Sequence, residues 1–339
     1  MTDTMSDPTH QSGTGSRASA QAVVMSGRQR GAQWALPVIL IVLIALFSIA
    51  RPESFFTSGN LTTILAGQAV LIFVALGAML PLIVGQFDLS VGANMAMAAV
   101  LTAKLAGEHS WPLLVAVAVV VAASASLGIL NGLLIAGIGV DSFVATLAVS
   151  SVVSGLLVWS TDGTVLSENI PVGLTDFGRR DILALPATFL CVIAAALIIA
   201  YILRSTPTGR FLYAIGGSAE AARLSGINVK RLTLGSFAVG GLMCGLGGVF
   251  LVAKVGSANP TTGPEFLLPA FAACFLGATS IRPGVFNVTG TVLAVLVIAV
   301  GTTGLQMFGA PFYIQPIFAG LVLLVASLAT RYLRSDQHG

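Results

Sequence analysis

Ten long apolar stretches follow one another along the chain, and short polar segments separate them. They cover residues 34–49, 61–84, 89–105, 111–138, 143–160, 185–203, 232–253, 266–276, 286–305 and 312–332. A bilayer core about 30 Å thick needs roughly 20 apolar residues in a helix. The stretches are too long and too uniformly apolar for the alternating strands of a membrane barrel. The pattern predicts an all-α polytopic membrane protein with about ten transmembrane helices.

The two ends of the chain differ from this pattern. Residues 1–31 are rich in Ser, Thr, Gly, Gln and Asp, which predicts a disordered cytoplasmic N-terminal tail. The tail is too long for the basic region of a signal peptide, so we expect the first apolar stretch to stay as a membrane helix. A transmembrane domain is expected over residues 32–334, followed by a C-terminal tail at 335–339.

The positive charges indicate how the chain is threaded. Only 9% of the residues are charged and 56% are hydrophobic, whereas soluble domains have about one quarter charged residues. With the N-terminus inside and ten crossings, eleven of the 16 Lys and Arg residues fall on the cytoplasmic side. Both termini are therefore expected in the cytoplasm. The net charge of +3 reflects this topology and does not indicate a nucleic-acid partner.

Two groups of four stretches, the second to fifth and the seventh to tenth, enter the membrane from opposite faces. This arrangement predicts an inverted repeat. In each group a glycine-interrupted segment joins the first two stretches, at residues 85–92 and 256–263. Broken helices at matching positions are typical of transport pathways. Ordinary turns are the alternative interpretation.

Several kinds of chemistry are missing from the sequence. There is no G-x-x-x-x-G-K-[ST] phosphate loop, so ATP, if it drives this protein, is bound elsewhere. The three histidines and three cysteines are scattered singly and predict neither a metal site nor a disulfide framework. No paired acid, base or nucleophile indicates an intramembrane enzyme.

Asp88 is the one acid expected within or near the membrane interior. Such a residue is a candidate functional group, although it also fits a cap for the helix that follows. Other polar residues in the apolar stretches are candidates for lining a path or for bonding helices together. The full set of path candidates is Asp88, Ser90, Asn94, Asn131, Thr146, Ser150, Asn259, Thr279 and Ser280.

One long cytoplasmic loop is expected at residues 204–231. Within it Glu220-Ala221-Ala222-Arg223-Leu224 favours a short helix, and Gly217 and Gly226 allow turns at its ends. A helix this short is marginal in water, so we expect it to dock on another surface.

Residues 208–218 and 220–227 resemble the coupling segment of ATP-binding-cassette (ABC) transporter permeases of the ribose type. Three further parts resemble elements of this family in the same order: 87–92, 143–147, and 257–261 with 277–280. The sequence departs from the family at 267–270, where Leu-Leu-Pro-Ala lacks the usual acid.

The resemblance implies a permease of a bacterial inner-membrane importer that moves a small neutral solute, expected to be a monosaccharide. Its short helix would insert into a separate cytoplasmic ATPase, which binds ATP and Mg, so this chain needs no cofactor and is not itself an enzyme. Further implied partners are a second permease, identical or related, and a periplasmic solute-binding protein. The implied ATPase contacts are Gly217, Glu220, Ala221, Ala222, Arg223 and Gly226. The alternative is an ion- or proton-coupled carrier that works as a single chain.

Overall fold

The computed structural model describes residues 33–311 and 313–335. The tail predicted at 1–31 and residues 336–339 of the predicted C-terminal tail lie outside the described residues. In chain order the elements are α2 (Ala35–Ala50), α3 (Ser58–Ile83), α4 (Val91–Thr102), η1 (Ala103–Glu108), α5 (Leu113–Gly132), η2 (Leu133–Ile138), α6 (Ser142–Thr161), α7 (Val172–Arg179), β1 (Asp181–Ile182), β2 (Leu185–Pro186), α8 (Ala187–Ser205), α9 (Pro207–Gly217), α10 (Ala219–Leu224), α11 (Val229–Val255), α12 (Gly263–Gly277), α13 (Val288–Met307) and α14 (Ile314–Ser335).

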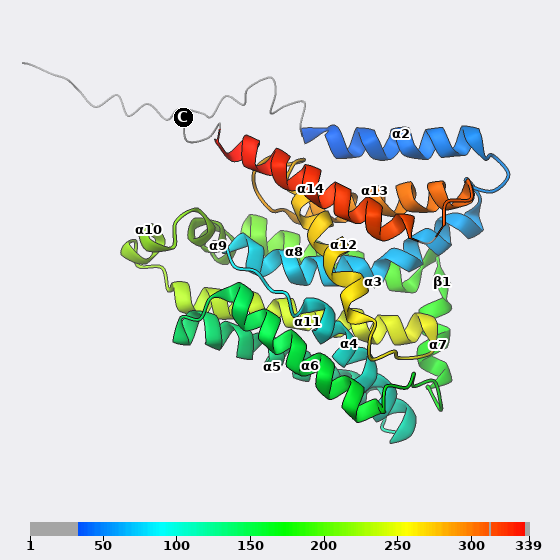
Figure 1. Ribbon diagram of the computed structural model, residues 1–339, viewed down its shortest axis with the longest axis horizontal. Coiled ribbons are helices and arrows are strands. Elements are labelled where there is room, and N and C mark those ends of the chain that lie inside the picture. The colour runs from blue at the N-terminus through cyan, green and yellow to red at the C-terminus, as the bar shows by residue number, and fades with distance from the viewer. Residues whose placement is uncertain (1–32, 312, 336–339) are drawn as a thin grey trace, which may run out of the picture.

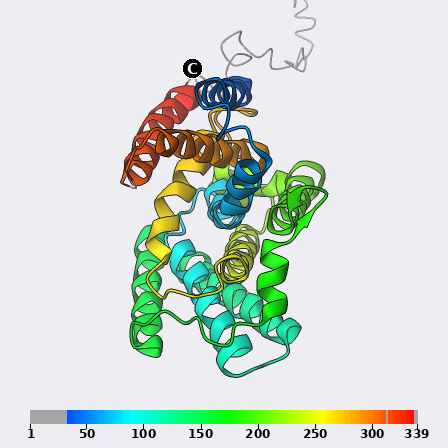
Figure 2. The ribbon, with the colours of Figure 1, turned by 90° about the vertical axis from the view of Figure 1, so that its right-hand side faces the viewer.

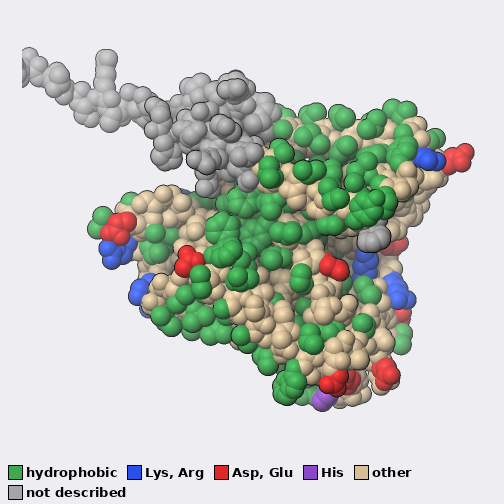
Figure 3. Space-filling model, viewed as in Figure 1, with side chains coloured by type: hydrophobic (Ala, Val, Ile, Leu, Met, Phe, Trp, Pro, Cys, Tyr) green, Lys and Arg blue, Asp and Glu red, His purple; other side chains and the backbone are tan. Residues whose placement is uncertain are grey.

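Each predicted apolar stretch coincides with one helix, or with an α-helix extended by a π-helical turn. Among the described residues, six helical segments are long and apolar enough to cross a membrane. α2, α12 and the part of α14 up to Ala326 are shorter apolar helices. The chain is therefore an all-α polytopic membrane protein. On the face drawn in Figure 3, hydrophobic side chains cover much of the surface and most charged side chains lie toward the ends of the helices.

Two long helices, α3 and α11, form the centre of the bundle, and Figure 2 looks along both of them. They pack closely because glycines face each other. A Cβ atom added to Gly77 or to Gly240 would lie 2.8 Å from the carbonyl oxygen of the other residue. Each helix is covered by its own set of neighbours, with α12 and α13 packed against α3, and α4 and α5 packed against α11.

The helix pattern is broken after each central helix, at the two glycine-interrupted segments. The chain is non-helical over residues 84–90 and 256–262, and α4 and α12 begin immediately afterwards. Both of these helices start in the middle of the molecule (Figure 1). Their first turns touch, since a Cβ added to Gly263 would lie 2.9 Å from the carbonyl carbon of Gly92. The two broken segments therefore bring two helix starts together.

The two ends of the bundle are built differently. At one end α7 packs against α11, strand β2 of the β1–β2 hairpin contacts α3 and α8, and a two-way backbone bridge joins Leu166 to Ala258. At the other end α9 and α10 form a projection, toward which the start of α2 and the end of α14 also point (Figure 1). The polar segment between α8 and α11 thus stands at a tip of the molecule.

Candidate functional site

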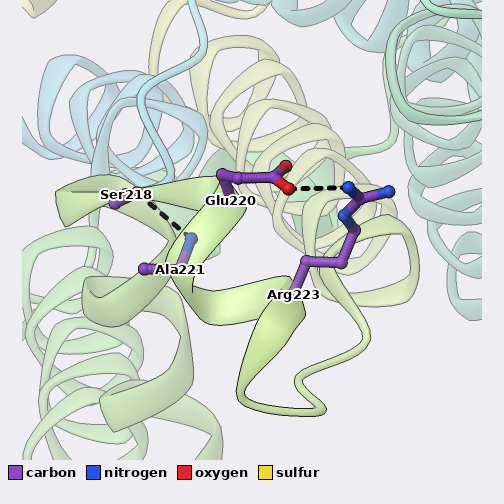
Figure 4. A network of polar contacts seen from close by, with 4 residues as sticks. All are labelled: Ser218, Glu220, Ala221 and Arg223. Atoms are coloured by element: carbon purple, nitrogen blue, oxygen red, sulfur yellow. Dashed lines mark hydrogen bonds and ion pairs between the residues drawn. The ribbon is translucent and has the colours of Figure 1, made fainter.

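Local sequence signals shape the projecting segment. Pro207 opens α9 at a position where its missing N–H has no helical partner to lose. α10 begins after Ser218, whose hydroxyl oxygen accepts a hydrogen bond from the Ala221 N–H at 3.2 Å (Figure 4). Gly226 follows the helix with a φ of +81°, a left-handed conformation that favours glycine. These end signals define a helix of six residues, which confirms the predicted short helix at 220–224, whereas Gly217, expected as the turn at its start, is the last residue of α9.

The outer face of α10 carries an exposed ion pair. Arg223 donates from Nη2 to Oε1 of Glu220 at 2.7 Å, and the two side chains are 69% and 65% exposed (Figure 4). The hydrogen bond to Glu220 raises the pKa of Arg223 above its ordinary value. An ion pair that is this exposed contributes little to stability. Its position leaves both side chains accessible to another protein.

One residue of the implied ATPase contact faces the other way. Ala222 is only 4% exposed and belongs to the main core cluster, so it anchors α10 to the bundle. The packed side chain of Ala222 presents little surface to a partner, and its contact with an ATPase stays a prediction. Gly217, Ala221 and Gly226 are exposed, in keeping with a contact surface.

A second polar group lies where the chain re-enters the bundle. Oδ1 of Asp88 accepts hydrogen bonds from the Ser90 backbone N–H at 2.9 Å and from the Ser90 hydroxyl at 2.6 Å. Asn131 on α5 donates to Ser90 Oγ at 2.8 Å and lies 3.5 Å from Asp88 Oδ1. All three residues are at most 2% exposed. Because buried polar groups need hydrogen-bond partners, this cluster fixes segment 84–90 to α5.

Helix α6 holds the same segment from the other side. The Leu89 N–H donates to Thr146 Oγ1 at 3.0 Å, and the Phe87 N–H donates to Ser142 Oγ at 3.1 Å. Ser142 was not among the sequence candidates. Its spacing of four residues from Thr146, which places both on one face of a helix, is the signal that points to it.

Asn94 bonds helices together. Its side-chain amide donates to the carbonyl oxygen of Ser124 on α5 at 3.1 Å. A Cβ added to Gly241 of α11 would lie 3.2 Å from that amide nitrogen. Asn94 therefore occupies the junction of α4, α5 and α11, and its buried position fits the helix-bonding interpretation rather than an open path.

The remaining path candidates are dispersed. Ser280 is fully buried and donates to the carbonyl oxygen of Gln33 at 2.9 Å. Thr279 donates to the carbonyl oxygen of Leu276 at 2.7 Å, within its own turn. Asn259 is exposed and Ser150 is half-buried on α6. The nine candidates thus form one compact cluster, around Asp88, and several separate positions.

The polar residues described above either form an exposed surface at α10 or hold helices and segment 84–90 together by hydrogen bonds. Within the described ranges, no three His, Cys, Asp or Glu side chains are grouped so that they could hold a metal ion. The Asp88 cluster is enclosed and bonded to the backbone. The exposed tip at α10 is the part of the segment that another protein can reach.

The sequence of the chain is similar to those of known transporter components. Residues 60–327 match the family described as the branched-chain amino acid transport system permease component. The chain belongs to this family. The match confirms the family resemblance found in the sequence and makes the protein a membrane transport component. No solved structure matches this permease.

Relatives of similar length align with most of the permease sequence. It is 33% identical to the ribose import permease protein RbsC of Haemophilus influenzae over 87% of this chain and 92% of the relative. It is 36% identical to RbsC of Bacillus subtilis, covering 86% and 90%. It is 29% identical to the D-allose transport system permease protein AlsC of Escherichia coli, covering 87% and 90%.

Proposed function

We propose that this permease is the membrane subunit of an ATP-driven importer for a neutral monosaccharide, placed in a bacterial inner membrane. The observation that carries the proposal is near full-length similarity to permeases named for sugar import. Besides ribose and D-allose permeases, the relatives include an L-arabinose permease and a fructose permease. A single buried acid in the described bundle is compatible with a neutral solute.

The proposal includes ten membrane crossings in a domain at residues 32–334, with both termini and the loop at 204–231 in the cytoplasm. The inverted repeat is supported by matching contacts in the two halves. α3 packs on α12 and α13 as α11 packs on α4 and α5, and α12 contacts α14 as α4 contacts α6. The start of α2 and the end of α14 point toward the end of the molecule that carries α10 (Figure 1). This shared direction supports the placement of both termini in the cytoplasm.

The proposed partners follow from the exposed tip and from the family. A cytoplasmic ATPase that binds ATP and Mg would receive α10 through Glu220, Ala221, Arg223, Gly217 and Gly226. A second permease, identical or related, and a periplasmic solute-binding protein would complete the importer. The chain itself then supplies alternating access, a change between two packings that its partners select.

The path is proposed to pass near the meeting of α4 and α12. Broken helices at matching positions are common at transport sites, and the contact of Gly92 with Gly263 puts two of them together. In this proposal Asp88, Ser90, Asn131 and Thr146 hold the re-entering segment in place. They act as supports of the path rather than as its lining.

Reconstitution tests the function directly. We expect the permease, assembled with its ATPase and binding protein in liposomes, to accumulate a monosaccharide only when ATP is supplied. Uptake by the permease alone, driven by an imposed ion gradient, would instead identify a single-chain carrier. Failure of every tested monosaccharide to stimulate ATP hydrolysis would reject the substrate class.

The docking role of α10 has its own test. Ala221→Trp places a bulky ring on the exposed face and should abolish solute-stimulated ATP hydrolysis while the permease still inserts normally. Leu197→Trp, at a 65% exposed position within the membrane-spanning helix α8, is the matched control and should leave hydrolysis intact. Full stimulation in Ala221→Trp would exclude docking through this face.

A further inference from the structure

Helix α9 touches the end of a central helix. A Cβ added to Gly216 would collide with the carbonyl oxygen of Ile83, the last residue of α3. The chain continues from there into segment 84–90, which carries Asp88. The backbone of α9 therefore rests directly against the point where α3 gives way to the re-entering segment.

The same helix is bonded to a second part of the bundle. The Tyr213 hydroxyl donates a hydrogen bond to the carbonyl oxygen of Phe286 at 2.9 Å, across 73 positions of sequence. Burial raises the pKa of Tyr213, and the nearby charge of Arg282 opposes this effect only in part. The hydroxyl group of Tyr213 therefore stays protonated at neutral pH and can donate this hydrogen bond.

The turn that receives this bond is stiff. Asn287 caps α13, because its Oδ1 accepts from the Gly290 N–H at 2.7 Å. Its amide nitrogen donates to the carbonyl oxygen of Gly277, the last residue of α12, at 3.2 Å. The Phe286 ring packs edge-on against Phe275 of α12, with 5.4 Å between centroids. A displacement at Phe286 is thus shared by the end of α12 and the start of α13.

A cavity of about 550 Å³ is lined by residues of both attachments of α9. Its lining includes Ile83, Gly85, Tyr213, Gly216 and Phe286. The cavity leaves unfilled space between α9 and the turn at residues 282–286. A movement of α9 relative to this turn would therefore change the shape of the cavity.

We propose that Tyr213 is a positioning residue of the transport cycle, whose hydroxyl carries movement of α10 and α9 to the turn between α12 and α13. The inference rests on the proposed function. A steric contact such as that of Gly216 with Ile83 transmits only a push. A hydrogen bond also transmits a pull, so the Tyr213 bond draws the turn along when α9 moves away.

The test removes one oxygen atom. In the reconstituted importer, Tyr213→Phe keeps the ring and loses only the donor to Phe286. We expect normal ATPase binding and ATP hydrolysis, but at least a threefold fall in solute imported per ATP hydrolysed. Tyr201→Phe, at a 66% exposed position on α8, is the control and should leave this ratio unchanged. An unchanged ratio in Tyr213→Phe overturns the proposal.

A labelling measurement separates transmission from general damage. Val285→Cys places a thiol in the cavity lining, and the parent chain with Cys191, Cys244 and Cys274 gives the background. Labelling at position 285 should change with ATP when Tyr213 is present and become insensitive to ATP in Tyr213→Phe. If ATP does not alter labelling with Tyr213 present, the turn does not move and the proposal fails, even if Tyr213→Phe does not assemble. Absence of ATP-driven uptake by the wild type would instead reject the proposed function.

Discussion

The contact between the starts of α4 and α12 predicts that one added methyl group is costly there. In Gly263→Ala the new Cβ would lie 2.9 Å from both the carbonyl carbon and oxygen of Gly92, and 3.1 Å from the Ala93 nitrogen. Ordinary contacts of a Cβ begin at 3.4 Å, so the helix starts must separate by roughly half an ångström. Backbone atoms cannot rotate away as a side chain does. Since overpacking costs typically 1–3 kcal/mol, we expect the free energy of unfolding to fall by about 2 kcal/mol.

Thermal unfolding of the purified permease in detergent measures this effect. A loss of that size should lower the melting temperature by about 3 °C. Gly155→Ala on α6 is the matched control, because its added Cβ would meet no atom within 4 Å. Alanine favours the helix by up to about 1 kcal/mol, so the control should melt at or slightly above the wild-type temperature. Equal melting of the two variants would refute the close contact between the helix starts.

Substitutions at three further positions are tested by the same measurement. Asn131→Leu leaves the Ser90 hydroxyl without its donor and should cost about 1–3 kcal/mol; wild-type melting would show that the Asp88 cluster holds without it. Thr146→Val removes the acceptor of the Leu89 N–H and should destabilise by a similar amount, whereas Thr146→Ser should restore wild-type melting. Glu220→Ala should leave the melting temperature unchanged, since its carboxylate is exposed; a drop of several degrees would make the ion pair a structural element.

Features decided by local chemistry were predictable from the sequence. Lipid requires every spanning segment to satisfy its own backbone, so apolar runs had to become helices. The glycine-interrupted segments did become the two breaks, because glycine and polar residues favour irregular backbone there. Gly226, predicted as a turn at the end of α10, does follow that helix in a left-handed conformation. At the start, the helix is capped by Ser218, which was not among the sequence predictions, because Gly217 is the last residue of α9.

Features decided by packing were not predictable. The inward direction of Ala222 depends on how α10 lies on the bundle, and no neighbouring residue reveals it. Asp88 and Asn131 are separated by 43 positions, and Tyr213 and Phe286 by 73. A polar residue in an apolar run looks the same whether it lines a path or bonds two helices, and only the partner across the interface distinguishes the two.

The bridge between Leu166 and Ala258 has an evolutionary consequence. Its two hydrogen bonds, at 2.9 and 2.8 Å, join backbone atoms only. Nearly any pair of side chains permits such bonds, proline excepted. The loop before α7 is thus free to diverge in its surface residues while it stays tied to the segment that leads into α12. Substitutions on the surface of this loop can therefore leave the connection beneath it intact.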